Sequence, residues 1–177
     1  MEDHVILVNE NDEQIGTMPK LEVHEKGILH RAFSVFLFNK KNELLIQQRA
    51  LTKYHSAGLW SNTCCSHPRE NENTQAAALR RLQEEMGIKS PINFLHSFIY
   101  HEEMENGLIE HEYDHIFIGR FNEMPIINES EVSHWKYISI PDLLDEMNMN
   151  PENFTIWFRI CLPTVLEKLS STHFNFN

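Results

Sequence analysis

Short runs of apolar residues, each followed by a polar turn, dominate the first third of the chain, and this is the pattern of strands. His4–Asn9 contains four consecutive apolar residues, and Ile15–Met18 is expected to return beside it as a partner strand. Ala32–Asn39 is dense in aromatic and β-branched residues, and Leu44–Arg49 follows after a polar turn. We therefore expect residues 32–49 to form a β-hairpin.

The middle of the chain changes to a helical period. Apolar residues stand at positions 78, 79, 82 and 86 of the segment Asn73–Met86, which is the spacing of a helix with one buried face. Asn73 or Thr74 is expected to cap its first turn, and Gly87 is expected to end it. The preceding residues 53–62 are expected to form a loop.

Beyond this helix, strands and helices are mixed without a regular alternation. Each of the two later helices is expected to begin at a proline, which fits the first turn because no backbone donor is needed there. The elements together predict one α/β domain over residues 1–177, with a mixed sheet flanked by helices and a short flexible tail from about residue 170. The expected later elements are strands at Asn93–Tyr100, Ile109–Arg120 and Trp135–Ser139, a turn near 105–107, and helices at Pro141–Met147 and Pro151–Leu169.

The charge of the chain narrows the classes of partner. It has 15 Lys and Arg residues against 26 Asp and Glu, so its formal net charge is −11. Such a chain repels nucleic acid and anionic membranes, and we expect neither as a partner. An anionic substrate would need a local concentration of cations or a bound metal.

The cysteines and the N-terminus indicate a cytoplasmic location. The chain has three cysteines, an odd number, and the adjacent Cys64 and Cys65 could pair only as a strained bridge. Free thiols in a reducing compartment are therefore expected. The N-terminus lacks the basic and apolar regions of a signal peptide. No apolar run approaches the roughly 18 residues needed to span a membrane.

Two short motifs carry residues suited to chemistry. Asn62–Pro68 contains the two adjacent cysteines and His67, and Glu110 and Glu112 follow further along the chain. In the expected strand these two carboxylates share one face, about 7 Å apart. Carboxylates that face a core must be paired or bound to metal. Histidine and glutamate ligands suit a first-row divalent ion rather than Ca²⁺.

The helix Arg80–Ile88 resembles the helix of the Nudix superfamily, which reads Arg-Glu-apolar-x-Glu-Glu-x-Gly-apolar. Clustered carboxylates in that motif hold Mg²⁺, which neutralises phosphate oxygens. Here Arg81 replaces the first glutamate, which argues against hydrolysis but still allows a diphosphate to be held. A solvated helix with an Arg81–Glu85 ion pair is the alternative interpretation. The matching residues are Glu72, Arg80, Glu84, Glu85 and Gly87, while Ser66 stands where the superfamily has glycine.

The joint occurrence of the Asn62–Pro68 motif and the Glu-x-Glu pair is more specific. With these motifs the chain resembles the type I isopentenyl-diphosphate Δ-isomerases, which are Nudix-fold enzymes, from about residue 4 to 165. The resemblance implies interconversion of isopentenyl and dimethylallyl diphosphate by protonation at C4 and deprotonation at C2. A carbocation-like species forms between these two steps. It further implies a small-molecule diphosphate as substrate and a monomer or weak homodimer.

The resemblance also implies roles for individual residues. One divalent metal, Zn²⁺ or Mn²⁺, would be bound by His24, His30, His67, Glu110 and Glu112. Mg²⁺ would be held against the diphosphate by Glu85, and the cationic contacts to the diphosphate would be Lys20, Arg49, Lys53 and Arg81. The catalytic residues would be Cys65, Glu112 and Tyr100, while Trp157 would face the carbon skeleton. Cys64 is expected to be structural.

These residue types suit the implied reaction. An alkene is a weak base, so a carboxyl on a metal, Glu112, is expected to supply the proton, with Tyr100 as a relay. Cys65, as a thiolate whose pKa is lowered by nearby cations or metal, is expected to remove the other proton from the opposite face. A dry pocket with Trp157 would protect and stabilise the cation.

Two other functions remain open from the sequence. A Nudix hydrolase of nucleoside diphosphates would need an intact carboxylate cluster, and it leaves Cys65 and His67 without a role. A zinc-stabilised interaction protein would have a closed ligand set. Its spacing would differ from the Cys-Cys-x-His found here, and it would have no need of clustered cations.

Overall fold

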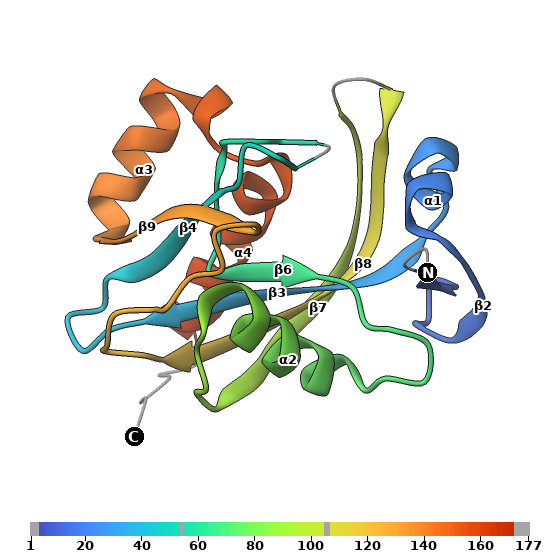
Figure 1. Ribbon diagram of the computed structural model, residues 1–177, viewed down its shortest axis with the longest axis horizontal. Coiled ribbons are helices and arrows are strands. Elements are labelled where there is room, and N and C mark those ends of the chain that lie inside the picture. Colours follow the sequence, from blue (N-terminus) through green and yellow to red (C-terminus); the bar gives the residue numbers. More distant parts are fainter. Residues whose placement is uncertain (1–3, 54, 105–106, 172–177) are drawn as a thin grey trace.

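A computed structural model describes residues 4–53, 55–104 and 107–171. The strands form one mixed sheet, and helices lie on both of its faces (Figure 1). The strands are β1 (His4–Val8), β2 (Gln14–Pro19), β3 (His30–Phe38), β4 (Leu44–Arg49), β5 (Trp60–Ser61), β6 (Cys64–Ser66), β7 (Ile92–Glu103), β8 (Ile109–Arg120) and β9 (Val132–Ile138). The helices are α1 (Lys20–Lys26), α2 (Thr74–Met86), α3 (Ile140–Met149) and α4 (Ile156–Ser171), with a 3₁₀ turn, η2 (Pro151–Asn153), before α4.

Strand β3 is the centre of the sheet. It runs parallel to β8 over its whole length, antiparallel to β6 on its other side, and also contacts β1 and β4. A parallel strand buried on both faces is expected to be continuously apolar, and every residue from 32 to 38 of β3 is buried. Strands β6, β3 and β8 therefore lie side by side at the buried centre of the sheet.

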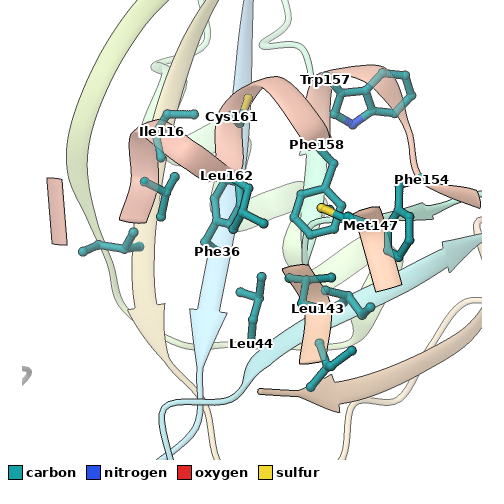
Figure 2. Close-up of a cluster of buried hydrophobic side chains, with 14 of the residues drawn as sticks. Phe36, Leu44, Ile116, Leu143, Met147, Phe154, Trp157, Phe158, Cys161 and Leu162 are labelled. Carbon is teal, nitrogen blue, oxygen red and sulfur yellow. The ribbon is translucent and has the colours of Figure 1, made fainter. Parts of the chain in front are cut away.

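Alternate residues of β3 enter two separate cores. Phe33, Val35 and Leu37 pack under α2, whereas Phe36 and Phe38 pack against α3 and α4. Figure 2 shows the second cluster, in which the rings of Phe36 and Phe158 lie 6.1 Å apart. Each fully buried apolar side chain of this kind contributes about 1.5–3 kcal/mol to stability. These two cores hold α2 and α4 against opposite faces of the sheet.

Helix α2 forms as the sequence predicts. The side chain of Asn73 accepts hydrogen bonds from the backbone N–H groups of Gln75 and Ala76, which confirms it as the N-cap. Gly87 ends the helix in the left-handed conformation. The buried face contains Ala78 and Leu82 but not Leu79, which is 38% exposed.

The prediction of a β-hairpin over residues 32–49 is confirmed only at the turn, and the rest of it is wrong. Strands β3 and β4 have one register pair, Phe38 with Leu44. From there β4 pairs with β9 and β5, while β3 pairs with β6 and β8. The two strands separate because β6 pairs with residues 33–35 of β3, on the edge that β4 would have to occupy, while β8 takes the whole opposite edge.

Three short elements were not expected from the sequence. Helix α1 spans seven residues between Pro19 and Gly27, and this is too short for a helical period to be recognised. Strands β5 and β6 are similarly short, and β5 lies inside the segment expected to be a loop. Their conformation follows from pairing with β4 and β3, which is tertiary information.

The expected start of the last helix at Pro151 is also wrong. Pro151 opens a 3₁₀ turn, Phe154 and Thr155 are extended, and α4 begins at Ile156. The chain is extended there because Phe154 forms a parallel bridge with Trp60, and the Thr155 N–H donates to the Trp60 carbonyl at 2.9 Å.

Some expectations cannot be compared with the structure. The tail beyond Ser171 and residues 105–106 of the expected turn lie outside the described residues. In the part of the chain that is described, no helix is long and apolar enough to cross a bilayer.

We predict that Gly87→Ala destabilises the protein more than Gly107→Ala. Both glycines have positive φ, 67° and 73°, where a Cβ costs about 1–2 kcal/mol. A Cβ at Gly87 would also lie 2.4 Å from the carbonyl oxygen of Ile126, whereas nothing lies within 4 Å at Gly107. Urea denaturation should show an additional loss of about 1–3 kcal/mol for Gly87→Ala. Equal losses in the two variants would contradict this clash.

Candidate active site

Three histidines and two glutamates meet at one end of the central strands. Helix α1 carries His24, β3 begins at His30, and His67 follows directly after β6. Glu110 and Glu112 lie on β8, whose parallel register places Glu112 opposite His30. The five residues predicted to bind Zn²⁺ or Mn²⁺ are therefore brought together, whereas Glu85, predicted to hold Mg²⁺, lies elsewhere. The alternation expected for β8 holds, because both glutamates are buried while the intervening His111 is partly exposed.

The ligand atoms in this cluster are close to one another. His67 Nε2 lies 2.8 Å from Glu112 Oε1, and His30 Nε2 lies 3.2 Å from His67 Nε2. The ligand atoms of His24, His30, His67 and Glu112 all lie within 4.8 Å of one another. Glu110 adjoins this group, with its Oε2 3.2 Å from His24 Nε2.

Backbone carbonyls orient two of the imidazoles. His24 Nδ1 lies 2.6 Å from the Lys20 carbonyl oxygen, and His30 Nδ1 lies 2.8 Å from that of Ile28. A carbonyl oxygen accepts only, so in each ring Nδ1 carries the hydrogen and the neutral form has its lone pair on Nε2. Both lone pairs point into the cluster, as they do in histidine ligands whose other nitrogen is held by the backbone.

Unpaired buried atoms in the cluster fit a divalent cation. His24 Nε2 and Glu110 Oε2 are buried and face each other at 3.2 Å, yet neither has a hydrogen-bond partner. With the His24 ring neutral, its Nε2 and the Glu110 oxygen are both acceptors, and they repel unless a proton or a metal cation lies between them. Nitrogen and carboxylate donors of this kind suit a first-row divalent metal. The residues therefore fit the metal site that the sequence predicts.

The two glutamates differ in their ionisation. Burial opposes charge on both, but the imidazoles of His30 and His67 hold the pKa of Glu112 well below its usual range. Burial and the neighbouring Glu112 carboxylate raise the pKa of Glu110. Burial lowers the pKa of His67 to about 3, so its ring is neutral at pH 7, as a metal ligand must be.

A small cavity of about 40 Å³ adjoins the cluster. Cys65 and Glu112 both line it, and they lie on strands that flank β3, where Cys65 of β6 pairs with Ser34 and Glu112 of β8 pairs with His30. Trp157, from the first turn of α4, also lines this cavity. The thiol and the carboxylate thus reach the same small space from opposite neighbours of one strand.

The two adjacent cysteines have different surroundings. Cys65 lines the cavity, with its Sγ 3.9 Å from Ser61 Oγ, whereas Cys64 is fully buried in the core under α2. Burial raises the pKa of the Cys65 thiol to about 12, although Arg49 acts in the opposite direction. The side chains around Cys65 favour the neutral thiol, and the expected thiolate, which depends on nearby cations or a bound metal, stays a prediction.

Tyr100 is placed behind Glu112 rather than in the cavity. Its hydroxyl donates to Glu112 Oε2 at 2.6 Å, and it is not among the described residues that line the cavity. Burial and the charge of Glu112 raise the pKa of Tyr100 well above its usual value, so it remains a donor. Tyr100 can therefore affect chemistry in the cavity through Glu112, which touches the space directly.

A larger cavity of about 350 Å³ lies next to the small one and is rich in cations. The two share Lys20, Arg49 and Cys65 in their linings. A net charge of −11 for the whole chain therefore coexists with a local positive site. The cationic lining residues are Lys20, Arg49, Lys53, Arg69, Arg80 and Arg81, and they face two carboxylates, Glu85 and Glu131.

Glu85 and Arg81 are fixed before any ligand binds. Arg81 Nη2 donates to Glu85 Oε1 at 2.6 Å, and Gln47 Nε2 donates to Glu85 Oε2 at 3.0 Å. Arg81 also lies 3.3 Å from Glu131, which in turn pairs with Lys53. Two of the predicted diphosphate contacts, Lys53 and Arg81, are thus held in one network, and all four line the same cavity.

Trp157 is held in a specific orientation. Its indole N–H donates to Ser61 Oγ at 2.9 Å, and the guanidinium of Arg49 lies 5.1 Å from its ring centroid. The tryptophan therefore faces the cavity as predicted, but one of its contacts is with a cationic side chain.

Sequence reasoning missed several residues of the site. Glu131 pairs with two of the cavity's cations, but it lies in an ordinary polar turn with no motif around it. His55 lines the small cavity and stands in the segment treated as a loop. Asp114 continues the Glu110–Glu112 face of β8 and is fully buried, and the same alternation that found the two glutamates would have indicated it.

Comparisons with known families and sequences agree with the geometry of the site. A family model described as the NUDIX domain matches residues 28–158. The chain is 52% identical over 159 residues to the isopentenyl-diphosphate Delta-isomerase 2 of Photorhabdus laumondii, covering 90% of each chain. It is 50% identical over 158 residues to the isopentenyl-diphosphate Delta-isomerase of Serratia proteamaculans, covering 89% of this chain and 88% of the relative.

Solved structures support the fold. A Deinococcus radiodurans protein has a TM-score of 0.70 at 20% identity, covering 83% of this chain and 90% of that one. The MutT protein of Methanosarcina mazei has a TM-score of 0.61 at 17% identity, covering 74% of this chain and 88% of that one. At these identities the likeness concerns the arrangement of sheet and helices alone.

We predict that His24→Ala weakens binding of a divalent metal and that His134→Ala does not. His24 points a lone pair into the cluster, whereas His134 is exposed on β9. After chelation and dialysis, titration with Zn²⁺ or Mn²⁺ should stabilise the parent and His134→Ala by about 2.7 kcal/mol at a hundred times the dissociation constant. His24→Ala should gain less, and a metal content equal to the parent's would contradict the assignment.

Proposed function

The chain belongs to the isopentenyl-diphosphate Δ-isomerases of the Nudix superfamily, and from this premise we propose how its two adjoining cavities interconvert isopentenyl and dimethylallyl diphosphate. The observation that carries the proposal is the contact between the two cavities. The cationic one suits a diphosphate, and the small one presents Cys65 and Glu112 to the attached carbons. The reaction transposes one double bond by adding a proton at C4 and removing one from C2.

The larger cavity binds the diphosphate. Lys20, Arg49, Lys53 and Arg81 contribute charge to its wall, and Arg81 is already oriented by its hydrogen bond to Glu85. Glu85 is the residue that would hold Mg²⁺, which prefers one or two carboxylates together with phosphate oxygens. Binding energy from the diphosphate positions a hydrocarbon that has no polar group of its own.

The small cavity moves the protons. Glu112 gives a proton to C4 and Cys65 removes one from C2, and the reverse direction exchanges these roles. The protein side chains alone favour the Glu112 carboxylate and the neutral Cys65 thiol, so this assignment requires the proton to be on Glu112 once substrate and metal are bound. Tyr100 donates to Glu112 and keeps its carboxyl oriented. A divalent ion in the His24–Glu110 cluster, Zn²⁺ or Mn²⁺, would supply positive charge that makes the nearby carboxyl group a stronger acid. The opposite placement of Cys65 and Glu112 about β3 supports proton transfer on opposite faces.

The cavity also suits a cationic species between the two steps. Its volume of about 40 Å³ leaves little room for water beside a bound hydrocarbon. Trp157 is 5% exposed and lines this space, and an aromatic ring contributes about 2 kcal/mol to a desolvated cation. These features protect the intermediate from capture as an alcohol.

The geometry disfavours a hydrolase. Arg81 stands where the Nudix helix has a metal-binding glutamate, and its guanidinium contacts Glu84, Glu85 and Glu131. One guanidinium thereby pairs with three carboxylates and reduces the net negative charge that recruitment of several metals would need. The cationic residues of the larger cavity can still hold a diphosphate, but this arrangement does not favour hydrolytic attack on it.

We expect isopentenyl diphosphate and Mg²⁺ in D₂O to give dimethylallyl methyl signals in the NMR spectrum of the metal-loaded protein. Deuterium should be incorporated, and no phosphate should be released, because the reaction moves protons and leaves the ester intact. Release of phosphate without a new alkene would instead indicate a hydrolase. A folded, metal-loaded sample that does neither would reject the proposed function.

We predict that Cys65→Ala and Glu112→Gln each lower kcat by about 10²–10⁴, the range for loss of a general acid or base. Cys64→Ala is the matched control, because this neighbouring thiol lies in the core and is not among the described residues that line either cavity. Circular dichroism should show that the variants are folded. Near-normal turnover of Cys65→Ala, or a loss of similar size in Cys64→Ala, would reject the role of Cys65.

A further inference from the structure

His55 is the one described residue shared by the linings of the small cavity and a third cavity. It lines both the space of about 40 Å³ beside the metal cluster and a groove of about 310 Å³ farther out. The outer groove lies between the segment after β4, the end of β7 and the start of α4. The other residues that line it are Ser56, Leu59, Glu103, Met104, Glu152, Phe154, Ile156 and Arg159.

The three cavities follow one another in space. The diphosphate cavity shares Lys20 and Arg49 with the small cavity, and the small cavity shares His55 with the outer groove. His55 is not among the residues that line the diphosphate cavity. A substrate whose diphosphate lies in the larger cavity would place its reacting carbons in the small one. The imidazole of His55 would then lie between these carbons and the outer groove.

The His55 ring is held by its neighbours. Its centroid lies 5.7 Å from that of Trp157 in an edge-to-face arrangement, and 6.2 Å from that of His24. Burial, together with Arg49 and Lys20, lowers the pKa of His55 to about 2, so the ring is neutral. His55 is not one of the four residues whose ligand atoms converge in the cluster. These contacts suit a packed wall rather than a further metal ligand.

Resting on the proposed function, we propose that His55 is the wall that restricts this enzyme to a five-carbon chain. Beyond the ring lie the apolar side chains of Leu59, Met104 and Ile156, which would suit additional methylene groups. Removing the imidazole would join the small cavity to this groove. A longer homologue would then fit with its diphosphate and its reacting carbons in their normal positions.

The test compares isopentenyl diphosphate with 3-methyl-3-pentenyl and 3-ethyl-3-butenyl diphosphates, which add one carbon at C4 or on the C3 methyl group. The measured quantity is kcat/KM of each homologue divided by that of isopentenyl diphosphate. His55→Ala should raise this ratio about tenfold or more for at least one homologue, which is the usual effect of one methylene group on discrimination. His55→Phe should leave the ratio at or below the parent value, because it keeps a ring in place.

Leu59→Ala is the matched control, because Leu59 lines the groove beyond the ring and outside the small cavity. It should leave the ratio and the turnover of isopentenyl diphosphate unchanged while His55 is present. The double variant His55→Ala/Leu59→Phe should lose part of the gain, because it refills the groove. If His55→Ala fails to fold, as judged by thermal unfolding, His55→Gln provides a smaller opening and a smaller increase in the ratio.

Two results would overturn the proposal. A ratio that does not rise for either homologue in a folded His55 variant would show that the ring does not limit chain length. An equal loss of kcat/KM for all three substrates would show that His55 positions Trp157 or His24 instead. Failure of the proposed function is distinguishable, because the parent protein would then not convert isopentenyl diphosphate at all.

Discussion

The parallel pairing of β3 with β8 is the interaction on which the site depends. It aligns His30 with Glu112, and it leaves Glu110 and Glu112 facing inward, at a depth where carboxylates are costly without partners. Two imidazoles hold Glu112 as an anion, yet Glu110 faces His24 without a hydrogen bond. The sheet register thus buries carboxylates that a cation would stabilise. The same register brings together three of the five residues that could bind it, His30, Glu110 and Glu112. Binding of a metal here would therefore be coupled to folding.

In the cavity proposed for the diphosphate, the local charge is also set by the way the fold groups its side chains. The chain carries an excess of acidic residues, but the wall of one cavity gathers six cationic side chains against two carboxylates. Glu131 forms ion pairs with Lys53 and Arg81, and Glu85 forms one with Arg81. These carboxylates hold the two cationic side chains close together before a substrate binds. A preorganised cluster loses less conformational entropy on binding than flexible surface lysines would. The charge of the whole chain is therefore a poor guide to the ligand, while its local distribution is informative.

Periodicity and turn residues predicted much of the fold, and the errors have physical causes. Helix α2 and strand β8 have clear periods and clear ends, so both were found. The β3–β4 hairpin was wrong because adjacency along the chain cannot show that β6 occupies the edge of β3 that the hairpin would use. The site residues came from resemblance to a family, since spacing alone does not bring His24 to Glu110. His55 and Glu131 lack any local signal, because their roles arise from what the fold places beside them.

The start of α4 shows how one tertiary contact determines the shape of the site. Proline at position 151 should begin a helix, yet the pairing of Phe154 with Trp60 keeps the chain extended until Thr155. The helix therefore begins at Ile156, and its first turn carries Trp157 into the small cavity while Phe154 and Ile156 line the outer groove. A helix started at the proline would turn these side chains to other directions. The boundary between reacting space and groove is thus fixed by backbone pairing, and the aromatic contact of His55 with Trp157 completes it.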